Sequence, residues 1–284
     1  MLLRQATRKA QEMTYKEAVS ILKEAGIGSC DYDAREIFVH FGGFNRSEIF
    51  LSNPNCDSSE LISAIERRAK REPLQYITGE TEFYRERYKL TPDCLIPRED
   101  TEILVDYAVK NLPEGALFLD LCTGSGCVAV SVLNNTKNTY AIAVDIDGGA
   151  LAVASENAVL NGVADRVHFR RMDLMRERVE EKVFAMLSNP PYVSEDCYIS
   201  LEKEIFFEPS HAFLGGRDGG DFYRHLTPIY KGKIADDGFI AYEIGYDQAD
   251  LLRSIANDCG MSCEILKDLS GHDRVAVLRK IKKD

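Results

Sequence analysis

The first part of the chain has the apolar period of helices. Ala18, Leu22 and Ala25 recur three or four residues apart behind Thr14, a residue type that caps helix N-termini. Similar patterns follow, each led by capping residues, and most end in glycine or a charged cluster. Residues 1–73 are therefore expected to form a small all-helical domain.

The pattern changes in residues 74–96. The run Tyr76–Tyr84 alternates between apolar and polar side chains with Gly79 inside it, and the shorter run Tyr88–Thr91 follows a charged turn. Alternation with a period of two is typical of strands. This segment is therefore predicted to be a β-hairpin linker between two domains.

From residue 97 onward, short apolar runs alternate with helical segments. Strands are expected at 117–119, 140–144, 167–169, 183–187 and 239–244, helices at 100–111, 126–134, 148–161, 221–232 and 247–258, and a closing antiparallel hairpin at 263–266 and 274–278. Alternating strands and helices predict a parallel sheet with crossover helices. Residues 97–284 are thus expected to form an α/β domain.

The net charge of the chain limits the kinds of molecule that it is expected to bind. The 284 residues carry a formal net charge of −11, which argues against a protein that wraps bare nucleic acid. Residues 1–75 contain as many basic as acidic residues, so the acidic excess falls on the rest and supports a boundary near Pro73. The basic cluster at 67–71 is expected to be a solvated helix end, with contact to a phosphate backbone as the alternative.

The cysteines and the apolar runs exclude other classes. None of the eight cysteines forms a Cys-x-x-Cys pair, and Cys259 and Cys263 lack the further ligands that zinc needs. We therefore expect reduced thiols and no metal. No signal peptide is visible, and no window approaches the ~18 apolar residues of a membrane span. A cytoplasmic protein without membrane contact is expected.

A glycine-rich turn, Asp120-Leu121-Cys122-Thr123-Gly124-Ser125-Gly126, follows the first expected strand of the α/β domain. Gly124 and Gly126 let the backbone approach a ligand, and the helix behind them presents free N–H groups. The turn lacks both the G-x-G-x-x-G pattern and the lysine of a P-loop. Alone it could hold a dinucleotide, a nucleotide phosphate or S-adenosylmethionine, but Asp120 suits the cationic α-amino group of a methionine moiety better than a pyrophosphate.

Acidic residues follow the next two strands. Asp145 stands roughly 20 residues after the glycines, where a carboxylate can accept hydrogen bonds from both ribose hydroxyls. A helix cap is the alternative for this residue. Asp173, after the third strand, is placed to meet an adenine amino group with Leu174 against the ring, although a simple turn aspartate would also fit.

The motif Asn189-Pro190-Pro191-Tyr192 ends the fourth strand, where two prolines hold the chain extended. Asn189 Oδ1 and the Pro190 carbonyl can each accept one N–H of a planar –NH2 group, and Tyr192 can stack on its face. Two such acceptors fix a weakly nucleophilic nitrogen opposite an electrophile and stabilise the positive charge that develops on it. A purely structural Asn-Pro turn is the alternative.

The turn at 120–126, Asp145 and the motif at 189–192 together resemble class I S-adenosylmethionine-dependent methyltransferases that act on exocyclic or amide nitrogens. Other segments resemble one family of these enzymes, the release factor glutamine methyltransferases (the HemK/PrmC type). These segments are Pro73–Gly79, Ile96–Glu102, Glu208–Gly220, Glu243–Gly245 with Gln248, and Asp268–Arg274. The resemblance covers nearly the whole chain.

The resemblance implies a Rossmann-like, seven-stranded class I methyltransferase domain behind the helical domain and the hairpin. It implies methylation of the glutamine side-chain amide in the Gly-Gly-Gln motif of peptide chain release factors, which modulates translation termination. The donor would be S-adenosyl-L-methionine and the product S-adenosyl-L-homocysteine. The helical domain and hairpin would grip the release factor, and no stable binding of nucleic acid is expected.

The resemblance also assigns residues. Asn189, Pro190 and Tyr192 would be catalytic and, with Pro191, would bind the substrate. The residues implied to hold the cofactor are Asp120, Cys122, Thr123, Gly124, Ser125, Gly126, Asp145, Asp173, Leu174 and Asn189. Two of them depart from the family pattern. Cys122 replaces a usual glycine, so its backbone is expected to have a conformation that a side chain tolerates, and Leu174 stands where an aromatic ring can occur, which would weaken stacking on adenine.

Two other functions remain open from the sequence. A nucleic acid amino-methyltransferase would use the same pocket on a flipped base and would need a basic face around it, which the acidic charge of residues 76–284 argues against. A factor-binding module without activity is the other alternative. The intact Gly124, Gly126, Asp145 and Asn189 count against it.

Overall fold

A computed structural model of the chain describes residues 12–282 and divides into two compact units, one ending at Gly79 and the other beginning at Glu80. The predicted arrangement of a helical domain to residue 73, a separate linker and an α/β domain from 97 therefore needs revision. The predicted linker is split between the two units. Each unit has its own hydrophobic core.

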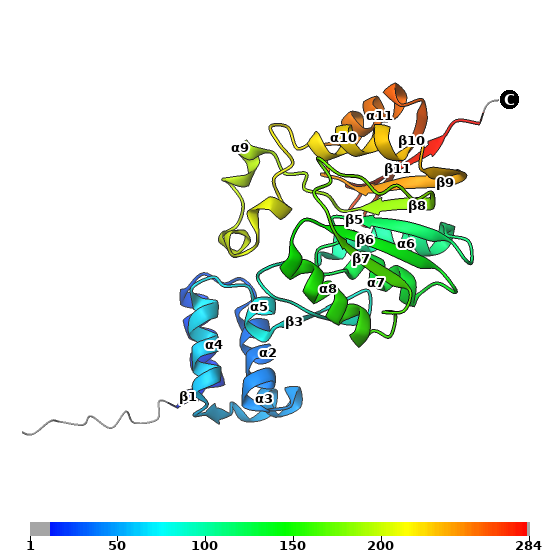
Figure 1. Cartoon of the computed structure of the whole chain (residues 1–284). Helices are drawn as coiled ribbons and strands as arrows, with labels where there is room; N and C mark the ends of the chain where they lie inside the picture. Colours follow the sequence, from blue (N-terminus) through cyan, green and yellow to red (C-terminus); the bar gives the residue numbers. More distant parts are fainter. Residues whose placement is uncertain (1–11, 283–284) are drawn as a thin grey trace, which may run out of the picture. The chain divides into compact units, whose positions relative to one another are not determined.

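The first unit is helical, as the apolar period predicts (Figure 1). Thr14 caps its first helix in a capping box with Glu17, so each residue satisfies a backbone N–H of the other. Leu22, Phe38 and Leu61 are fully buried in its core. Its elements are β1 (Met13–Thr14), α1 (Tyr15–Glu24), α2 (Cys30–Gly42), α3 (Arg46–Ser52), β2 (Asn55–Cys56), α4 (Ser59–Ala69) and α5 (Leu74–Thr78).

The basic cluster at 67–71 is not the solvated helix end that was expected. Arg68 is only 7% exposed and bonds Asp33 at 2.7 Å, a buried ion pair between α4 and α2. Arg67 pairs with Glu72, and Arg71 donates to the Gly26 carbonyl at 2.7 Å. These three arginines therefore stabilise the helical unit through bonds to its other residues. A buried guanidinium, such as that of Arg68, requires a partner of this kind.

The start of the predicted hairpin is also wrong, because residues 74–78 form helix α5 rather than a strand. Pro73 stands at its N-cap, and Gly79, with a φ of 75°, at its C-cap. A left-handed glycine is a common helix end, so it marks a stop here rather than the middle of a strand. The hairpin itself is β3 (Glu80–Phe83) paired with β4 (Glu86–Lys89).

The hairpin belongs to the second unit because β4 is anchored by a buried carboxylate. Glu86 accepts hydrogen bonds from Asn134 at 2.9 Å and Asn135 at 2.8 Å, and also from Ser131 and Tyr88. Tyr88 itself is fully buried. A carboxylate with this many donors is well satisfied inside the protein, so β4 is fixed to the α/β unit.

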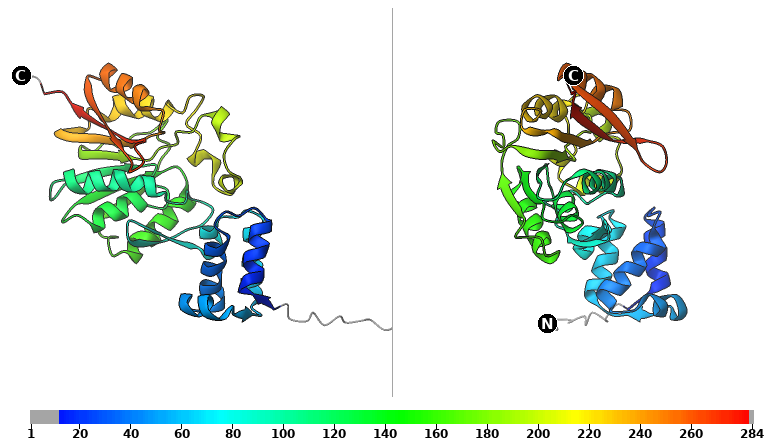
Figure 2. Two further views of the ribbon diagram at one scale, coloured as in Figure 1. Left: turned by 180° about the vertical axis from the view of Figure 1, so that it is seen from behind. Right: turned by 90° about the vertical axis from the view of Figure 1, so that its right-hand side faces the viewer.

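The second unit contains the predicted seven-stranded sheet, in the order β10-β11-β9-β8-β5-β6-β7. Strands β5 to β9 run parallel to one another, and β11 is antiparallel to both β9 and β10. All seven predicted strands of this sheet are confirmed, although β9 begins earlier than expected. The strands are β5 (Leu117–Leu121), β6 (Tyr140–Asp145), β7 (Val167–Arg171), β8 (Val183–Ser188), β9 (Ile234–Glu243), β10 (Met261–Lys267) and β11 (Asp273–Lys280). Figure 2 shows the closing hairpin β10–β11, orange to red, at one edge of the sheet.

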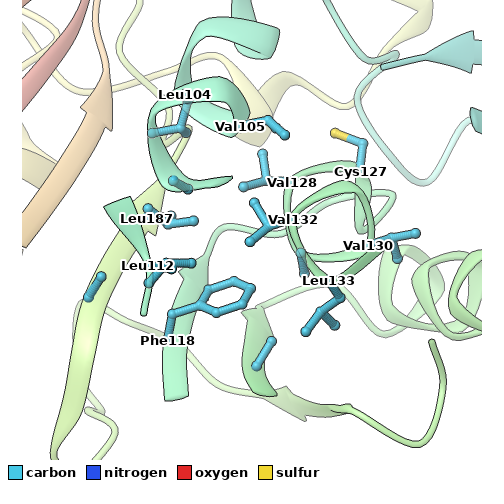
Figure 3. Close-up of a cluster of buried hydrophobic side chains, with 14 of the residues drawn as sticks. Leu104, Val105, Leu112, Phe118, Cys127, Val128, Val130, Val132, Leu133 and Leu187 are labelled. Atoms are coloured by element: carbon cyan, nitrogen blue, oxygen red, sulfur yellow. The ribbon is translucent and has the colours of Figure 1, made fainter. Parts of the chain in front are cut away.

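Helices cover both faces of this sheet. On one face Leu104, Val128 and Val132 pack against Phe118 and Leu187 of the strands (Figure 3). On the other face the buried residues of α10 and α11 meet the remaining strand side chains. The helical elements are η1 (Glu99–Thr101), α6 (Glu102–Asn111), α7 (Cys127–Asn134), α8 (Gly148–Leu160), α9 (Glu195–Tyr198), η2 (Lys203–Phe207), η3 (Ser210–Ala212), α10 (Asp221–Tyr230) and α11 (Ala249–Asp258). Within residues 12–282 no helix has the length and apolar character that crossing a membrane requires.

Candidate active site

A cavity of about 400 Å³ opens at the carboxyl ends of β5, β6, β7 and β8. Parallel sheets place ligands at this edge, where the strand order reverses direction along the chain. Its volume is within the range of small-molecule sites. Seven of the predicted site residues line it: Cys122, Gly124, Asp145, Asp173, Leu174, Asn189 and Pro191.

The turn between β5 and α7 forms one wall of the cavity. Gly124, with a φ of 54°, lines the cavity, and no atom lies within 4 Å of where a Cβ would stand on it. Cys122 has a φ of 62°, so the expectation of a conformation that readily tolerates a side chain is wrong. The left-handed residue reverses the chain, and the next residue, Thr123, donates to the Val144 carbonyl at 3.0 Å.

Gly126 is not among the residues that line the cavity, and the place of its missing side chain faces a neighbouring helix. Its φ is 80°, and a Cβ on it would lie 3.0 Å from the Ala154 Cβ and 3.2 Å from the Ala154 Cα. Ala154 belongs to α8, so the glycine permits α7 and α8 to pack closely. The two glycines of the turn therefore have different roles.

Replacing Gly126 with alanine is expected to lower the free energy of unfolding by about 2 kcal/mol, because it adds left-handed strain and a helix–helix clash. The matched variant Gly124→Ala has the same strain without the clash. It should cost about 1 kcal/mol and should mainly weaken ligand binding. Chemical denaturation of both variants measures the difference, and equal losses would contradict the packing role of Gly126.

Asp120 organises the turn from within. It is 1% exposed and does not line the cavity. Its Oδ2 accepts hydrogen bonds from Thr123 Oγ1 at 2.6 Å and from the Ala129 backbone at 3.0 Å. Its Oδ1 has no hydrogen-bond partner among residues 12–282. Burial raises the pKa of Asp120 to about 7, and the unpaired oxygen is a costly feature of the protein interior.

Asp145 lines the cavity at the end of β6. Its Oδ2 accepts from the Gly124 backbone N–H at 2.8 Å, and its Oδ1 accepts from the Asp147 N–H at 3.0 Å. The alternative role of helix cap is taken by Asp147, whose Oδ1 accepts from Gly149 N at 2.7 Å. Burial raises the pKa of Asp145, and the two backbone donors oppose that shift. Each of its oxygens keeps a lone pair for a ligand hydroxyl.

Asp173 and Leu174 lie across the cavity after β7. Asp173 Oδ1 accepts from the Met175 backbone at 3.0 Å, so the residue does form the turn that the sequence left open as an alternative. Leu174 is 5% exposed and packs into the core beneath the cavity. An aliphatic side chain at this place offers an apolar surface without a stacking face.

The motif after β8 is divided between the cavity and the protein interior. Asn189 and Pro191 line the cavity, whereas Pro190 is buried and Tyr192 is half-buried behind them. The Tyr192 hydroxyl donates to Glu243 Oε1 at 3.1 Å, and burial raises the pKa of Tyr192. The motif is therefore anchored from behind by its aromatic residue.

Glycines of the segment 215–219 hold the motif from the other side. A Cβ on Gly215 would lie 2.5 Å from the Pro191 carbonyl oxygen, and one on Gly219 would lie 2.1 Å from the Tyr192 carbonyl oxygen. Gln248 Nε2 also donates to the Tyr192 carbonyl at 3.0 Å. Only residues without a side chain allow this approach, so these glycines fix the path of the motif.

A buried carboxylate joins the walls of the cavity. Glu208 is 5% exposed, accepts from the Ile96 backbone at 2.9 Å and pairs with Arg98. The residues after it, 209–212, line the cavity. Sequence reasoning gave no role to Glu208, Gln248, Thr101 or Glu243. All four are polar residues within the segments that carry the family resemblance. The sequence alone assigned no chemical role to them.

The buried carboxyl of Glu243 makes the free energy of unfolding depend on pH. Burial raises its pKa from 4.5 to about 7, so the folded chain retains a proton that the unfolded chain has already released. This retained proton stabilises the folded protein by roughly 2–4 kcal/mol below pH 4.5. The stabilisation is lost as the pH rises through about 7. Glu243→Gln should therefore gain stability relative to wild type between pH 5 and about 8.

Denaturation of both proteins across that range measures the gain, and Glu82→Gln, at an exposed position, controls for the loss of one charge. A difference between Glu243→Gln and wild type that stays constant with pH would contradict the buried carboxyl.

The sheet order, with its antiparallel last strand and a cavity at the ends of β5 to β8, defines a class I methyltransferase fold. Residues 99–223 match the family model "Methyltransferase small domain", and residues 14–79 match "PrmC N-terminal domain". The helical unit and the α/β unit thus each correspond to a described domain.

Curated relatives show the family. The chain is 38% identical over 260 residues to a release factor glutamine methyltransferase of Thermodesulfovibrio yellowstonii, which covers 88% of this chain and 92% of the relative. Identity is 33% over 276 residues to the enzyme so named in Clostridium botulinum, covering 93% of this chain and 97% of the relative. It is also 33% to the one in Fusobacterium nucleatum, covering 94% and 78%. The chain belongs to the release factor glutamine methyltransferase family.

Proposed function

We propose that this protein transfers a methyl group from S-adenosyl-L-methionine to the side-chain amide nitrogen of the glutamine in the Gly-Gly-Gln motif of peptide chain release factors. The observation that supports this best is the shared cavity: Asn189 lines the same space as Gly124 and Asp145. A motif suited to holding a nitrogen thus lies beside a site suited to a nucleoside, in a chain that belongs to this family.

The cavity fits the proposed methyl donor in several ways. The open side of Gly124 admits a ligand close to the backbone, and the buried Asp120 holds this turn in place through Thr123 and Ala129. Asp145 can accept hydrogen bonds from ribose hydroxyls while it holds the turn. Asp173 and Leu174 offer a polar and an apolar contact for the adenine. Cys122, Thr123, Ser125 and Gly126 shape the turn.

The bound donor supplies an electrophilic methyl group on a sulfonium. Asn189 Oδ1 and the Pro190 carbonyl would accept the two N–H bonds of the glutamine amide, Pro191 would pack against its planar face, and Tyr192 would hold the motif in place from behind. These acceptors would stabilise the positive charge that develops on the glutamine nitrogen as it takes the methyl group from the sulfonium, which leaves as a neutral thioether. The nitrogen then loses a proton, so no strong base is needed before the attack.

The helical unit and the hairpin would hold the release factor, and the enzyme would work in the cytoplasm with its substrate. A protein partner also suits the acidic chain better than naked nucleic acid does. The alternative, an amino-methyltransferase of nucleic acid bases, gains no support from the named relatives.

Incubation with methyl-labelled S-adenosylmethionine tests the proposal when a full-length release factor, transfer RNA, ribosomal RNA and DNA are offered separately. Label is expected on the release factor and should be absent when its Gly-Gly-Gln glutamine is replaced by alanine. Label on a nucleic acid but not on the release factor would refute the proposed substrate.

A further inference from the structure

A chain of buried hydrogen bonds lies behind the Asn189–Tyr192 motif and joins it to the start of α6 and the end of β9. Thr101 Oγ1 lies 2.5 Å from Glu243 Oε2, and the Tyr192 hydroxyl lies 3.1 Å from Glu243 Oε1. Asn189 Nδ2 lies 3.2 Å from Thr101 Oγ1. Thr101 and Glu243 are 1% and 2% exposed, so water does not compete for these bonds.

The chemistry of these groups fixes the direction of each bond. An ionised carboxylate only accepts, so both hydroxyls must donate to Glu243. Thr101 has one proton, and once it points at Glu243 the oxygen can only accept from its other neighbour. Asn189 must therefore present its –NH2 to Thr101. Because the carboxamide is planar, its oxygen is directed away from Thr101 and remains available as an acceptor.

The network depends on the charge of Glu243, which burial disfavours. When Glu243 is protonated it becomes a donor itself, and the Thr101 proton is then free to point elsewhere. The constraint on the Asn189 amide is lost at that moment. The titratable and charged groups that face Glu243 from the surrounding elements are Asp100 of η1, Cys127 of α7, Tyr192 of the motif, Tyr223 of α10 and Arg274 of β11.

We propose that Thr101 and Glu243 are positioning residues for methyl transfer, which hold the Asn189 carboxamide with its oxygen toward the cavity and its –NH2 toward the protein. This role rests on the proposed function of Asn189 as an acceptor for the glutamine amide. It explains why polar residues that are distant in the chain meet behind one motif. Thr101 is 88 residues from Asn189 and 142 residues from Glu243.

Thr101→Val tests the role because valine keeps the shape of threonine and removes its hydroxyl. The freed carboxamide should lower kcat roughly 10- to 100-fold, since it no longer holds one orientation. The KM for the release factor should change little. Thr101→Ser restores the hydroxyl and should recover most of the loss. In the background of Asn189→Ala, Thr101→Val should cause no further loss, because its effect passes through Asn189.

Thr227→Val is the matched control. Thr227 is fully buried in α10 and its hydroxyl lies 3.2 Å from the Tyr242 hydroxyl. This variant removes an equally buried hydroxyl whose partner, Tyr242, is not a member of the Thr101–Glu243 chain, so it should lower the thermal midpoint without lowering kcat. A comparable fall of kcat in both variants would mean that Thr101 acts only through stability and would overturn the proposal.

The pH profile gives a second readout that also serves if Thr101→Val folds poorly. Wild-type kcat is expected to fall as the pH decreases through about 7, where Glu243 gains its proton. Glu243→Gln should have a lower kcat and no such fall. An unchanged acid limb in this variant, or full activity of folded Thr101→Val, would overturn the positioning role. A wild-type enzyme that methylates nucleic acid and not the release factor would instead contradict the proposed function.

Discussion

Replacing Asn189 with alanine is expected to lower kcat for release factor methylation by about 10²- to 10³-fold. The side chain lines the cavity, and in the proposed function it supplies one of two acceptors for the amide hydrogens. Without it, the developing positive charge on nitrogen loses a preorganised dipole, and the nitrogen loses its alignment with the methyl group. The effect should fall on kcat more than on KM, because the lost contact acts on the reacting amide and not on the rest of the release factor.

Single-turnover kinetics with saturating release factor measures this loss directly. Asn111→Ala is a suitable control, since Asn111 also donates a side-chain hydrogen bond, to the Tyr107 carbonyl, but does not line the cavity. It should leave the rate within about twofold. An Asn189→Ala enzyme with nearly wild-type kcat would mean that the amide is held by other groups.

Replacing Asp145 with alanine should weaken binding of S-adenosylmethionine roughly 10- to 100-fold, because hydrogen bonds to a charged acceptor contribute about 1.5–3 kcal/mol. Two losses combine in this variant. The ribose hydroxyls lose their acceptor, and Gly124 loses the carboxylate that holds its backbone N–H at 2.8 Å. Isothermal titration calorimetry of the free enzyme measures the change in Kd.

Asp147→Ala provides the matched control two residues away. Asp147 caps α8 through Gly149 and Ala150, so its loss should lower stability by about 1 kcal/mol and leave the Kd almost unchanged. Equal Kd values for wild type and Asp145→Ala would remove Asp145 from the cofactor site.

The fold was largely predictable because the α/β unit repeats a strong local signal. Each buried strand between helices appears as a short apolar run, and five such runs locate β5 to β9. The helix α5 was missed because Tyr76 and Ile77 fit a strand as well as a helix over so few residues. The residues that mark this helix are Pro73 before it and the left-handed Gly79 after it. They indicate where a helix begins and ends, and they do not form a periodic pattern of apolar residues.

The cavity side of the site was predictable for a topological reason. Residues that follow successive parallel strands must meet at one edge of the sheet, so Gly124, Asp145 and Asn189 were brought together by the fold. The supporting side was not predictable, because Thr101 lies 88 residues from Asn189 along the chain and 142 residues from Glu243. The packing role of Gly126 was not predictable for a related reason, since its constraint comes from Ala154 on a different helix.

Locating the modified atom by mass spectrometry tests the central claim most directly. A release factor incubated with this protein and S-adenosylmethionine would be digested, and its Gly-Gly-Gln peptide sequenced by fragmentation. The account predicts one added methyl group on the glutamine side-chain amide, and none after incubation with Asn189→Ala for the same short time. An unmodified glutamine, or a methyl group on another residue of the release factor, would contradict it.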